Sequence, residues 1–192
     1  MPKVPADGTD PADAAAIVGR YELDTGGSFD VTVTDDRPVI SASGADAVAA
    51  LFPPRADVPA AGLRAHERRV LALLGGQTDE GHRERAGIEA GFGPITGVTL
   101  GGTTSAGETR TYVTVTTRKR SILAWYSLNE QGGVQAAEIP TRPPALPLVA
   151  SGGGSHRPDD PAGVGPEVTL RFGEGRVTVS GPAGETSARS AG

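Results

Sequence analysis

Apolar and polar residues alternate with a period of two in the first part of the chain. The alternation runs through residues 20–23, 29–34, 39–43 and 48–52, and Gly- or Asp-rich turns separate these segments. A period of two is typical of strands that bury one face, because successive side chains point to opposite sides of a sheet. This part of the sequence therefore predicts a β-meander of short strands.

The pattern changes to a helical period after a Pro- and Ala-rich linker over residues 53–62. Leu63, Val70, Leu71 and Leu74 share one face of a predicted helix that ends at a pair of glycines. A second, more polar helix is predicted over residues 82–90. Thr78 is its expected N-cap.

Strand-like composition returns after the second helix, over residues 95–101, 109–118, 121–128 and 134–139. Two helices followed by antiparallel strands make an α+β unit. A second linker over 140–166 contains one further candidate strand at 145–149.

The end of the chain carries the clearest hairpin signal. Val168, Leu170 and Phe172 alternate with polar residues, a Gly-Glu-Gly turn follows, and Val177 and Val179 continue the alternation. Residues 181–192 then become rich in Gly, Ser and Ala.

The predicted fold class is α+β and β-rich, with a lipocalin-like antiparallel meander or barrel plus a small helix-helix-sheet module. The expected domains are a lipocalin-like β domain formed by 18–54 and 142–190, and the α+β module over 62–140. Residues 1–17 are expected to be disordered apart from a short helix that begins near Pro11. Glycine (28) and proline (16) make up about a quarter of the chain, which favours compact parts joined by long connections.

Charge and composition exclude several classes of protein. The formal net charge is −5, and the densest basic run, Arg118-Lys119-Arg120, is expected at a solvated hairpin tip, so nucleic acid is not an expected partner. The chain has no cysteine, and no segment is long and apolar enough to span a membrane. No signal-peptide core is present, so a cytoplasmic location is the default expectation.

Motifs for catalysis, metals or cofactors are absent from the sequence. No Ser is followed three residues later by Lys, and no Gly-x-Ser-x-Gly occurs. Ser155-His156 follows three glycines and is expected in a flexible loop. His66 and His82 lie on different predicted helices and are expected on their surfaces, with a shared metal site as the alternative. Asp159-Asp160 is expected in a turn, with calcium binding as the alternative.

Three aromatic residues are the candidates for a ligand pocket. Trp125 and Tyr112 lie on predicted strands, and Phe92 follows the second helix. Aromatic side chains of this kind line small-molecule pockets, although packing in a hydrophobic core is the competing explanation.

Several segments resemble the lipocalin-like C-terminal domain of beta-lactamase-related serine hydrolases. These are the Gly19-Arg20-Tyr21 start, the strand around Val31, the Leu51-Phe52-Pro53 close and the terminal hairpin that ends at Ala188-Arg189. The middle of the chain is similar to nuclear-transport-factor-2-like α+β modules. The resemblance implies a β barrel beside a catalytic domain that lies outside this sequence, so no catalytic residue carries over.

Three functional hypotheses follow. The first is a non-catalytic accessory or ligand- and partner-binding domain, whose partner is a serine hydrolase catalytic domain or a small apolar ligand. The second is a stand-alone small-molecule binder or isomerase of the nuclear-transport-factor-2-like type. The third is an interaction protein without a pocket. The sequence does not define the ligand or the oligomeric state.

Overall fold

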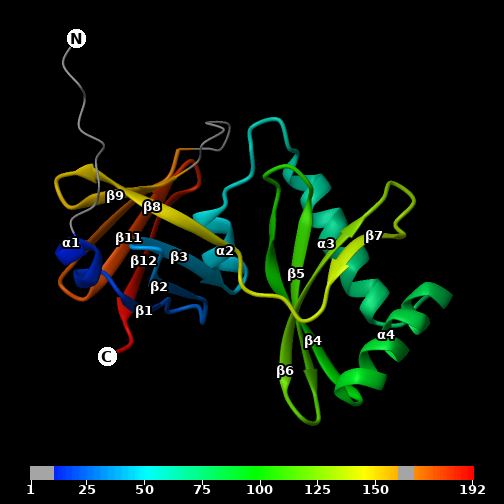
Figure 1. The fold of residues 1–192 in the computed structure, drawn as a ribbon. Helices are drawn as coiled ribbons and strands as arrows, with labels where there is room; N and C mark the ends of the chain where they lie inside the picture. Colours follow the sequence, from blue (N-terminus) through cyan, green and yellow to red (C-terminus); the bar gives the residue numbers. More distant parts are fainter. Residues whose placement is uncertain (1–10, 160–166) are drawn as a thin grey trace. The chain divides into compact units, whose positions relative to one another are not determined.

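The structure is a computed structural model that describes residues 11–159 and 167–192, and it contains two compact units (Figure 1). Residues 1–53 and 144–192 form the first unit, and residues 54–143 form the second. The second unit is therefore an insertion in the chain of the first. The sequence pattern places these boundaries at 18–54 with 142–190, and at 62–140. Residues 1–10, which are expected to be disordered, lie outside the described residues. Asp160, the second residue of the alternative calcium site, also lies outside them.

The first unit is a closed antiparallel barrel of the up-and-down type. Its strands pair in the order β1-β12-β11-β10-β9-β8-β3-β2, so each strand lies beside its neighbour in the unit's own sequence. The strands are β1 (Gly19–Glu22), β2 (Ser28–Thr34), β3 (Arg37–Ser43), β8 (Ala145–Gly152), β9 (Ser155–Pro158), β10 (Thr169–Gly173), β11 (Arg176–Gly181) and β12 (Gly184–Ser190). The barrel confirms the β-rich, lipocalin-like fold class.

Alternate residues of these strands fill the barrel interior. Phe29, Ile40, Leu170 and Val177 are completely buried, and they belong to one hydrophobic cluster. An eight-stranded barrel is just wide enough for such side chains to occupy its interior. Tyr21, from the Gly-x-Tyr start, joins this core, and its hydroxyl donates to the Ile17 carbonyl at 3.0 Å.

One predicted strand of the meander is a helix. Helix α2 (Ala45–Leu51) replaces the strand expected over 48–52, and it packs against β3 and β11. Four of its seven residues are alanine, which has the highest helix propensity. Val48 and Leu51 lie three positions apart and face the barrel core, which is helical spacing. Helix α1 (Pro11–Ala16) is the short helix expected near Pro11.

The glycine tract in the second predicted linker is a tight hairpin rather than a flexible loop. Strands β8 and β9 pair on either side of it. Gly152, Gly153 and Gly154 have φ angles of 89°, 61° and 74°, a region that residues with a β-carbon rarely occupy. The Gly-, Ser- and Ala-rich end of the chain contains strand β12, which pairs with both β11 and β1 and closes the barrel.

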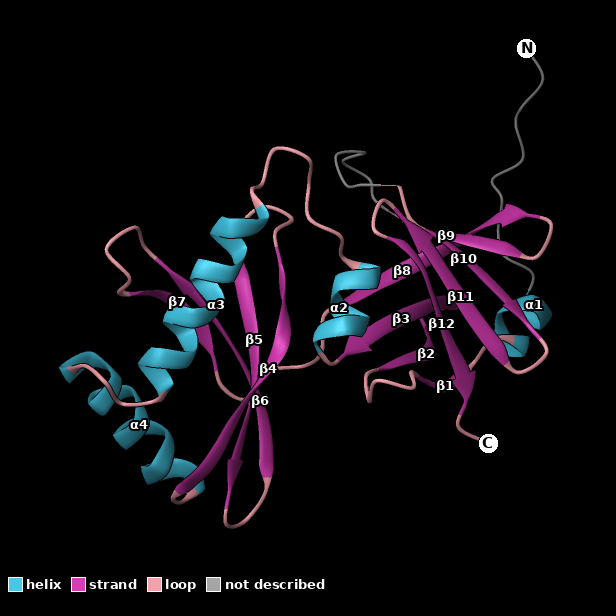
Figure 2. Cartoon of the chain, turned by 180° about the vertical axis from the view of Figure 1, so that it is seen from behind, coloured by secondary structure: helices cyan, strands magenta, loops and turns pink. Residues whose placement is uncertain are grey.

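The inserted unit has two helices on one face of a four-stranded antiparallel sheet, as Figure 2 shows. Its elements are α3 (Ala60–Leu74), α4 (Asp79–Phe92), β4 (Ile95–Thr104), β5 (Arg110–Thr117), β6 (Ser121–Leu128) and β7 (Val134–Glu138). The strands pair in the order β4-β5-β6-β7, so β4 and β7 are its edges. The pairing of β4 with β5 is irregular at two places, between Ile95 and Gly97 and between Leu100 and Gly102.

Close approach of α3 and α4 depends on a glycine. A β-carbon at Gly81 would lie 2.3 Å from the Leu73 carbonyl oxygen, so no larger residue fits without a shift of the backbone. Thr78 caps α4 as expected, because its hydroxyl accepts from the Gly81 N–H at 3.0 Å. None of the helices in the described part of the chain is long and apolar enough to cross a membrane.

Truncation of the barrel core tests this architecture. Leu170→Ala removes a fully buried side chain, and we expect the free energy of unfolding to fall by about 2–5 kcal/mol. Arg171→Ala is the matched control, because Arg171 is the next residue of β10 and faces outward. It should change the free energy of unfolding by less than about 0.5 kcal/mol. Chemical denaturation followed by circular dichroism measures both values. Equal effects of the two substitutions would contradict the assignment of inward and outward faces.

Candidate functional site

The structure brings two of the three sequence-predicted pocket residues together, but not the third. Tyr112 and Trp125 are directly opposed on β5 and β6. Their immediate neighbours Val113 and Ala124 pack against the helices, so Tyr112 and Trp125 project from the other face of the sheet. Phe92 packs on the helix side. The three side chains therefore line no common pocket.

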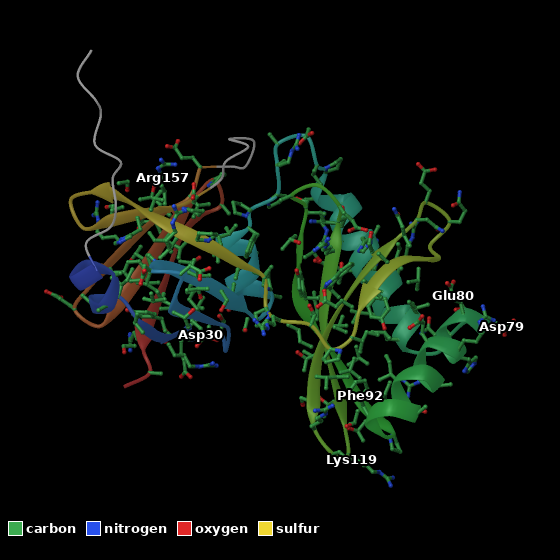
Figure 3. All side chains as sticks on the ribbon, viewed as in Figure 1. Asp30, Asp79, Glu80, Phe92, Lys119 and Arg157 are labelled. Carbon is green, nitrogen blue, oxygen red and sulfur yellow. The ribbon has the colours of Figure 1, made fainter. Side chains whose placement is uncertain are left out.

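Trp125 and Phe92 each lie against a different arginine. The Trp125 indole N–H donates to Glu138 at 3.0 Å, and the Arg110 guanidinium lies 4.2 Å from the centre of the Trp125 ring. Phe92 lies near the β5–β6 turn, close to Lys119 (Figure 3). The Arg120 guanidinium lies 4.9 Å from the Phe92 ring. The basic run at this turn is exposed, as the sequence pattern indicates.

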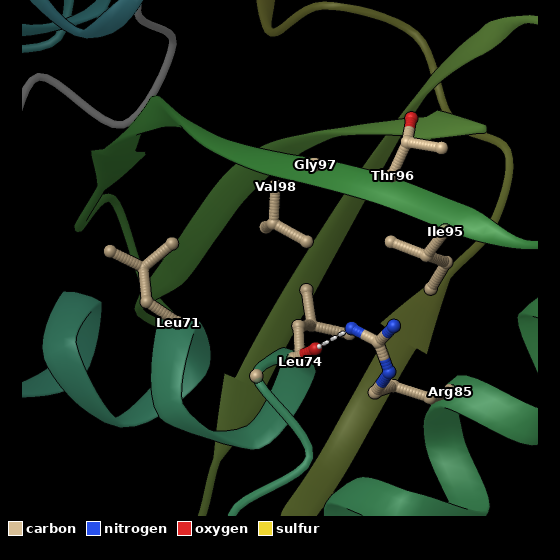
Figure 4. A pocket seen from close by; sticks show the side chains of 8 residues that line it. Leu71, Leu74, Arg85, Ile95, Thr96, Gly97 and Val98 are labelled. Carbon is tan, nitrogen blue, oxygen red and sulfur yellow. Dashed lines mark hydrogen bonds between the residues drawn. The ribbon is translucent and has the colours of Figure 1, made fainter. Parts of the chain in front are cut away.

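A groove between the helices and the edge strand β4 is the candidate site, and sequence reasoning missed it. Its volume is about 390 Å³, and its walls come from both helices and from the start of β4 (Figure 4). The apolar wall consists of Leu71, Leu74, Ile95 and Val98. Arg85 supplies the charged group. A volume near the lower end of the range for ligand pockets suits a small molecule.

The guanidinium of Arg85 fixes one end of this groove. Nη1 donates to the carbonyl of Leu74 at 2.7 Å, in the last turn of α3 (Figure 4). Nη2 donates to Glu89 Oε1 at 3.3 Å, and the same oxygen accepts from the Ile95 N–H at 3.1 Å. Arg85 and Glu89 thereby connect α3, α4 and β4. We call this arrangement the arginine clamp.

A chain of hydrogen bonds centred on His66 fixes the other part of α3 to the sheet. His66 Nε2 accepts from the Leu128 N–H at 3.1 Å, and Nδ1 lies 2.8 Å from the Thr111 hydroxyl. Thr111 contacts the Thr103 hydroxyl at 3.0 Å, and Thr103 donates to Glu67 at 2.9 Å. These bonds join α3 to β4, β5 and β6. We call this arrangement the histidine clamp.

Burial shifts the pKa of two groups on this side of the sheet. Burial is the main cause that lowers the pKa of His66; Arg69 lowers it further, and Glu67 opposes the shift. Burial also raises the pKa of Tyr126 well above its ordinary value, and Glu84, whose carboxylate accepts from the tyrosine hydroxyl, adds to the shift. Both groups are therefore neutral at pH 7.

The other candidates from the sequence lie apart from the groove. His82 is exposed on α4, and no group of three His, Asp or Glu residues able to hold a metal ion occurs in residues 11–159 or 167–192. His156 is buried in the barrel, with its ring 5.4 Å from that of Phe172. Asp159 lies 3.5 Å from Arg37 in an ion pair.

No protein-family description, curated protein or solved structure matches this chain. The groove and the two clamps are therefore the features of the molecule that bear on its function.

Removal of the arginine clamp tests its structural role. Arg85→Ala removes the hydrogen-bond donor of the Leu74 carbonyl oxygen and one donor to Glu89 Oε1. We therefore expect the free energy of unfolding to fall by about 1–3 kcal/mol. Arg83→Ala, at an exposed position of the same helix, is the control and should have little effect. Urea denaturation measures the difference. A loss no greater than that of the control would show that Arg85 does not hold the helices.

Proposed function

We propose that this chain is a non-catalytic binding protein in which the inserted unit recognises a small ligand or a partner. The observation that carries the proposal is the groove between α3, α4 and β4, with four aliphatic side chains and one guanidinium. Aliphatic walls favour an apolar ligand, because contact removes apolar surface from water. The guanidinium is held in place by Leu74 and Glu89, and its remaining N–H groups can donate to a polar or anionic group on that ligand.

The barrel acts as the scaffold in this proposal. Its interior is occupied by large, fully buried side chains such as Phe29 and Leu170. Its closure leaves each strand hydrogen-bonded on both sides. A scaffold of this kind tolerates a large insertion between two strands, since insertions concentrate at connections rather than within elements.

In its narrower form, the proposal assigns an accessory role beside a serine hydrolase catalytic domain. The support is the sequence resemblance around Gly19-Arg20-Tyr21 together with the up-and-down topology of the barrel. The cytoplasm is the proposed location.

A second candidate function is a stand-alone small-molecule binder or isomerase of the nuclear-transport-factor-2-like type. The observation that favours it is the collection of polar groups on the helix side of the sheet, where Tyr126 contacts Glu84 and His66 contacts Thr111. Groups with shifted pKa values on one face of a sheet are a common feature of sites that move protons.

A groove-filling substitution tests the proposed binding site. The probe is 8-anilinonaphthalene-1-sulfonate, which combines an apolar ring system with an anionic group. We expect Leu71→Trp to fill the groove and to weaken probe binding at least about tenfold, a loss of roughly 1.4 kcal/mol. Leu63→Trp is the control on the same helix, at a position that does not line the groove. Fluorescence titration measures both dissociation constants.

The result of this titration decides whether the groove is the binding site of the probe. Weaker binding in Leu71→Trp alone supports the groove as the site. Unchanged binding in both variants places the probe elsewhere and overturns the proposal.

Assays for hydrolysis test the non-catalytic part of the proposal. We expect no turnover of nitrocefin or p-nitrophenyl acetate above the rate in buffer, because the sequence contains neither Ser-x-x-Lys nor Gly-x-Ser-x-Gly. Rates are followed by absorbance at several protein concentrations. A rate that increases in proportion to protein concentration and survives repeated purification would contradict this part of the proposal while leaving the groove as a binding site.

A further inference from the structure

The hydrogen bonds around His66 determine which of its two nitrogens carries the proton. Thr103 donates its single hydroxyl proton to Glu67, so it accepts in its contact with Thr111. Thr111 has then used its own proton and accepts from His66 Nδ1, which therefore carries a hydrogen. At the other end of the ring, Nε2 accepts from the Leu128 N–H and therefore carries none.

Both ends of the chain of bonds thus require the same neutral form of the ring, protonated on Nδ1 alone. The bonds run in one direction, from the backbone of β6 through His66 to Thr111, Thr103 and Glu67. Each group in this network donates to the next one. The addition of a single proton therefore removes an acceptor and breaks a hydrogen bond.

We infer that His66 is a proton-sensitive latch, which holds the N-terminal half of α3 on the sheet when the imidazole is neutral and releases it when the imidazole is protonated. Protonation places a hydrogen on Nε2, which then faces the Leu128 N–H across 3.1 Å. Two donors cannot bond to each other, so the link between α3 and β6 breaks. The inference concerns the ligand-free chain and does not depend on binding in the groove.

Several groups around the ring determine the direction in which the pKa of His66 shifts. Arg69, on α3 itself, disfavours the charged ring, and Glu67 on the same helix favours it. From the sheet, Thr103, Thr111 and Tyr126 are neutral neighbours in the network or beside it, and Glu84 of α4 is already engaged by the Tyr126 hydroxyl. Burial is the largest effect, and it disfavours the charged ring.

The sign of the pH dependence follows from this direction of shift. The pKa of His66 is lower in the folded chain than in the unfolded chain, where it is about 6.5. The latch therefore contributes its full stability above about pH 6.5. This contribution is lost as the pH falls from about 6.5 towards the pKa of the folded chain. The guanidinium of the arginine clamp does not lose its proton and stays a hydrogen-bond donor. Acidification therefore acts on the His66 end of α3 through the imidazole.

Nuclear magnetic resonance of the 192-residue chain tests the tautomer directly. Long-range ¹H–¹⁵N correlation spectra at pH 7.5 should show a protonated Nδ1 and an unprotonated Nε2 for His66. Titration should give His66 a pKa below the ordinary value of about 6.5 for histidine. Spectra of His66→Gln and His82→Gln assign the two rings. A protonated Nε2 at pH 7.5, or a His66 pKa at or above the ordinary value of about 6.5, would overturn the inference even if the glutamine variants fold poorly.

Hydrogen exchange of the Leu128 amide tests release of the latch. Because one proton is involved, protection of this amide in the wild type should fall between pH 7 and pH 5 by at most about tenfold per pH unit, after correction for intrinsic exchange. The amide of Val113, in the centre of the sheet, should keep its protection. His82→Gln should behave as the wild type, and His66→Gln should lose the pH dependence. A pH dependence that persists in His66→Gln would assign the opening to another group.

Discussion

Closure of the barrel depends on the pairing of β3 with β8, two strands that the whole inserted unit separates in the chain. Val39, Ile40 and Ser41 pair with Pro147, Leu146 and Ala145, and the Ala42 N–H donates to the Pro144 carbonyl at 3.0 Å. A flexible connection of this length would oppose the pairing through the entropy of loop closure. The inserted unit avoids most of this cost if it folds by itself and holds its own ends in place.

The inserted unit has the internal contacts that such a role requires. A hydrophobic cluster that includes Val70, Leu74, Val113 and Tyr126 lies between its helices and its sheet. The histidine and arginine clamps add polar links at two separate places along α3. The candidate groove lies on the same helix and the same edge strand as these clamps, so its width depends on how firmly they hold α3 to the sheet.

The local elements were largely predictable, whereas the site was not. Alternation and turn residues indicate the strands of the inserted unit and most strands of the barrel, but not β9 or β12, and Thr78 indicates the start of α4. The alternation over residues 48–52 predicts a strand, whereas the four alanines of α2 favour the helix that the structure contains. The groove combines Leu71, Arg85 and Val98, which lie on three elements, and no local spacing indicates their meeting. Tyr112, Trp125 and Phe92 share a residue type but not a face of the sheet, and residue type alone does not show on which face a side chain lies.

The two irregularities in β4 have a consequence for self-association. A straight, ten-residue edge strand offers unpaired backbone groups to the edge of another molecule, which is a route to aggregation. The shifts in register near Gly97 and Gly102 bend β4, so a second straight strand cannot follow its full length. The protein thus combines a barrel that has no edge to offer with an open sheet whose longest edge is interrupted, and this combination disfavours growth into fibrils.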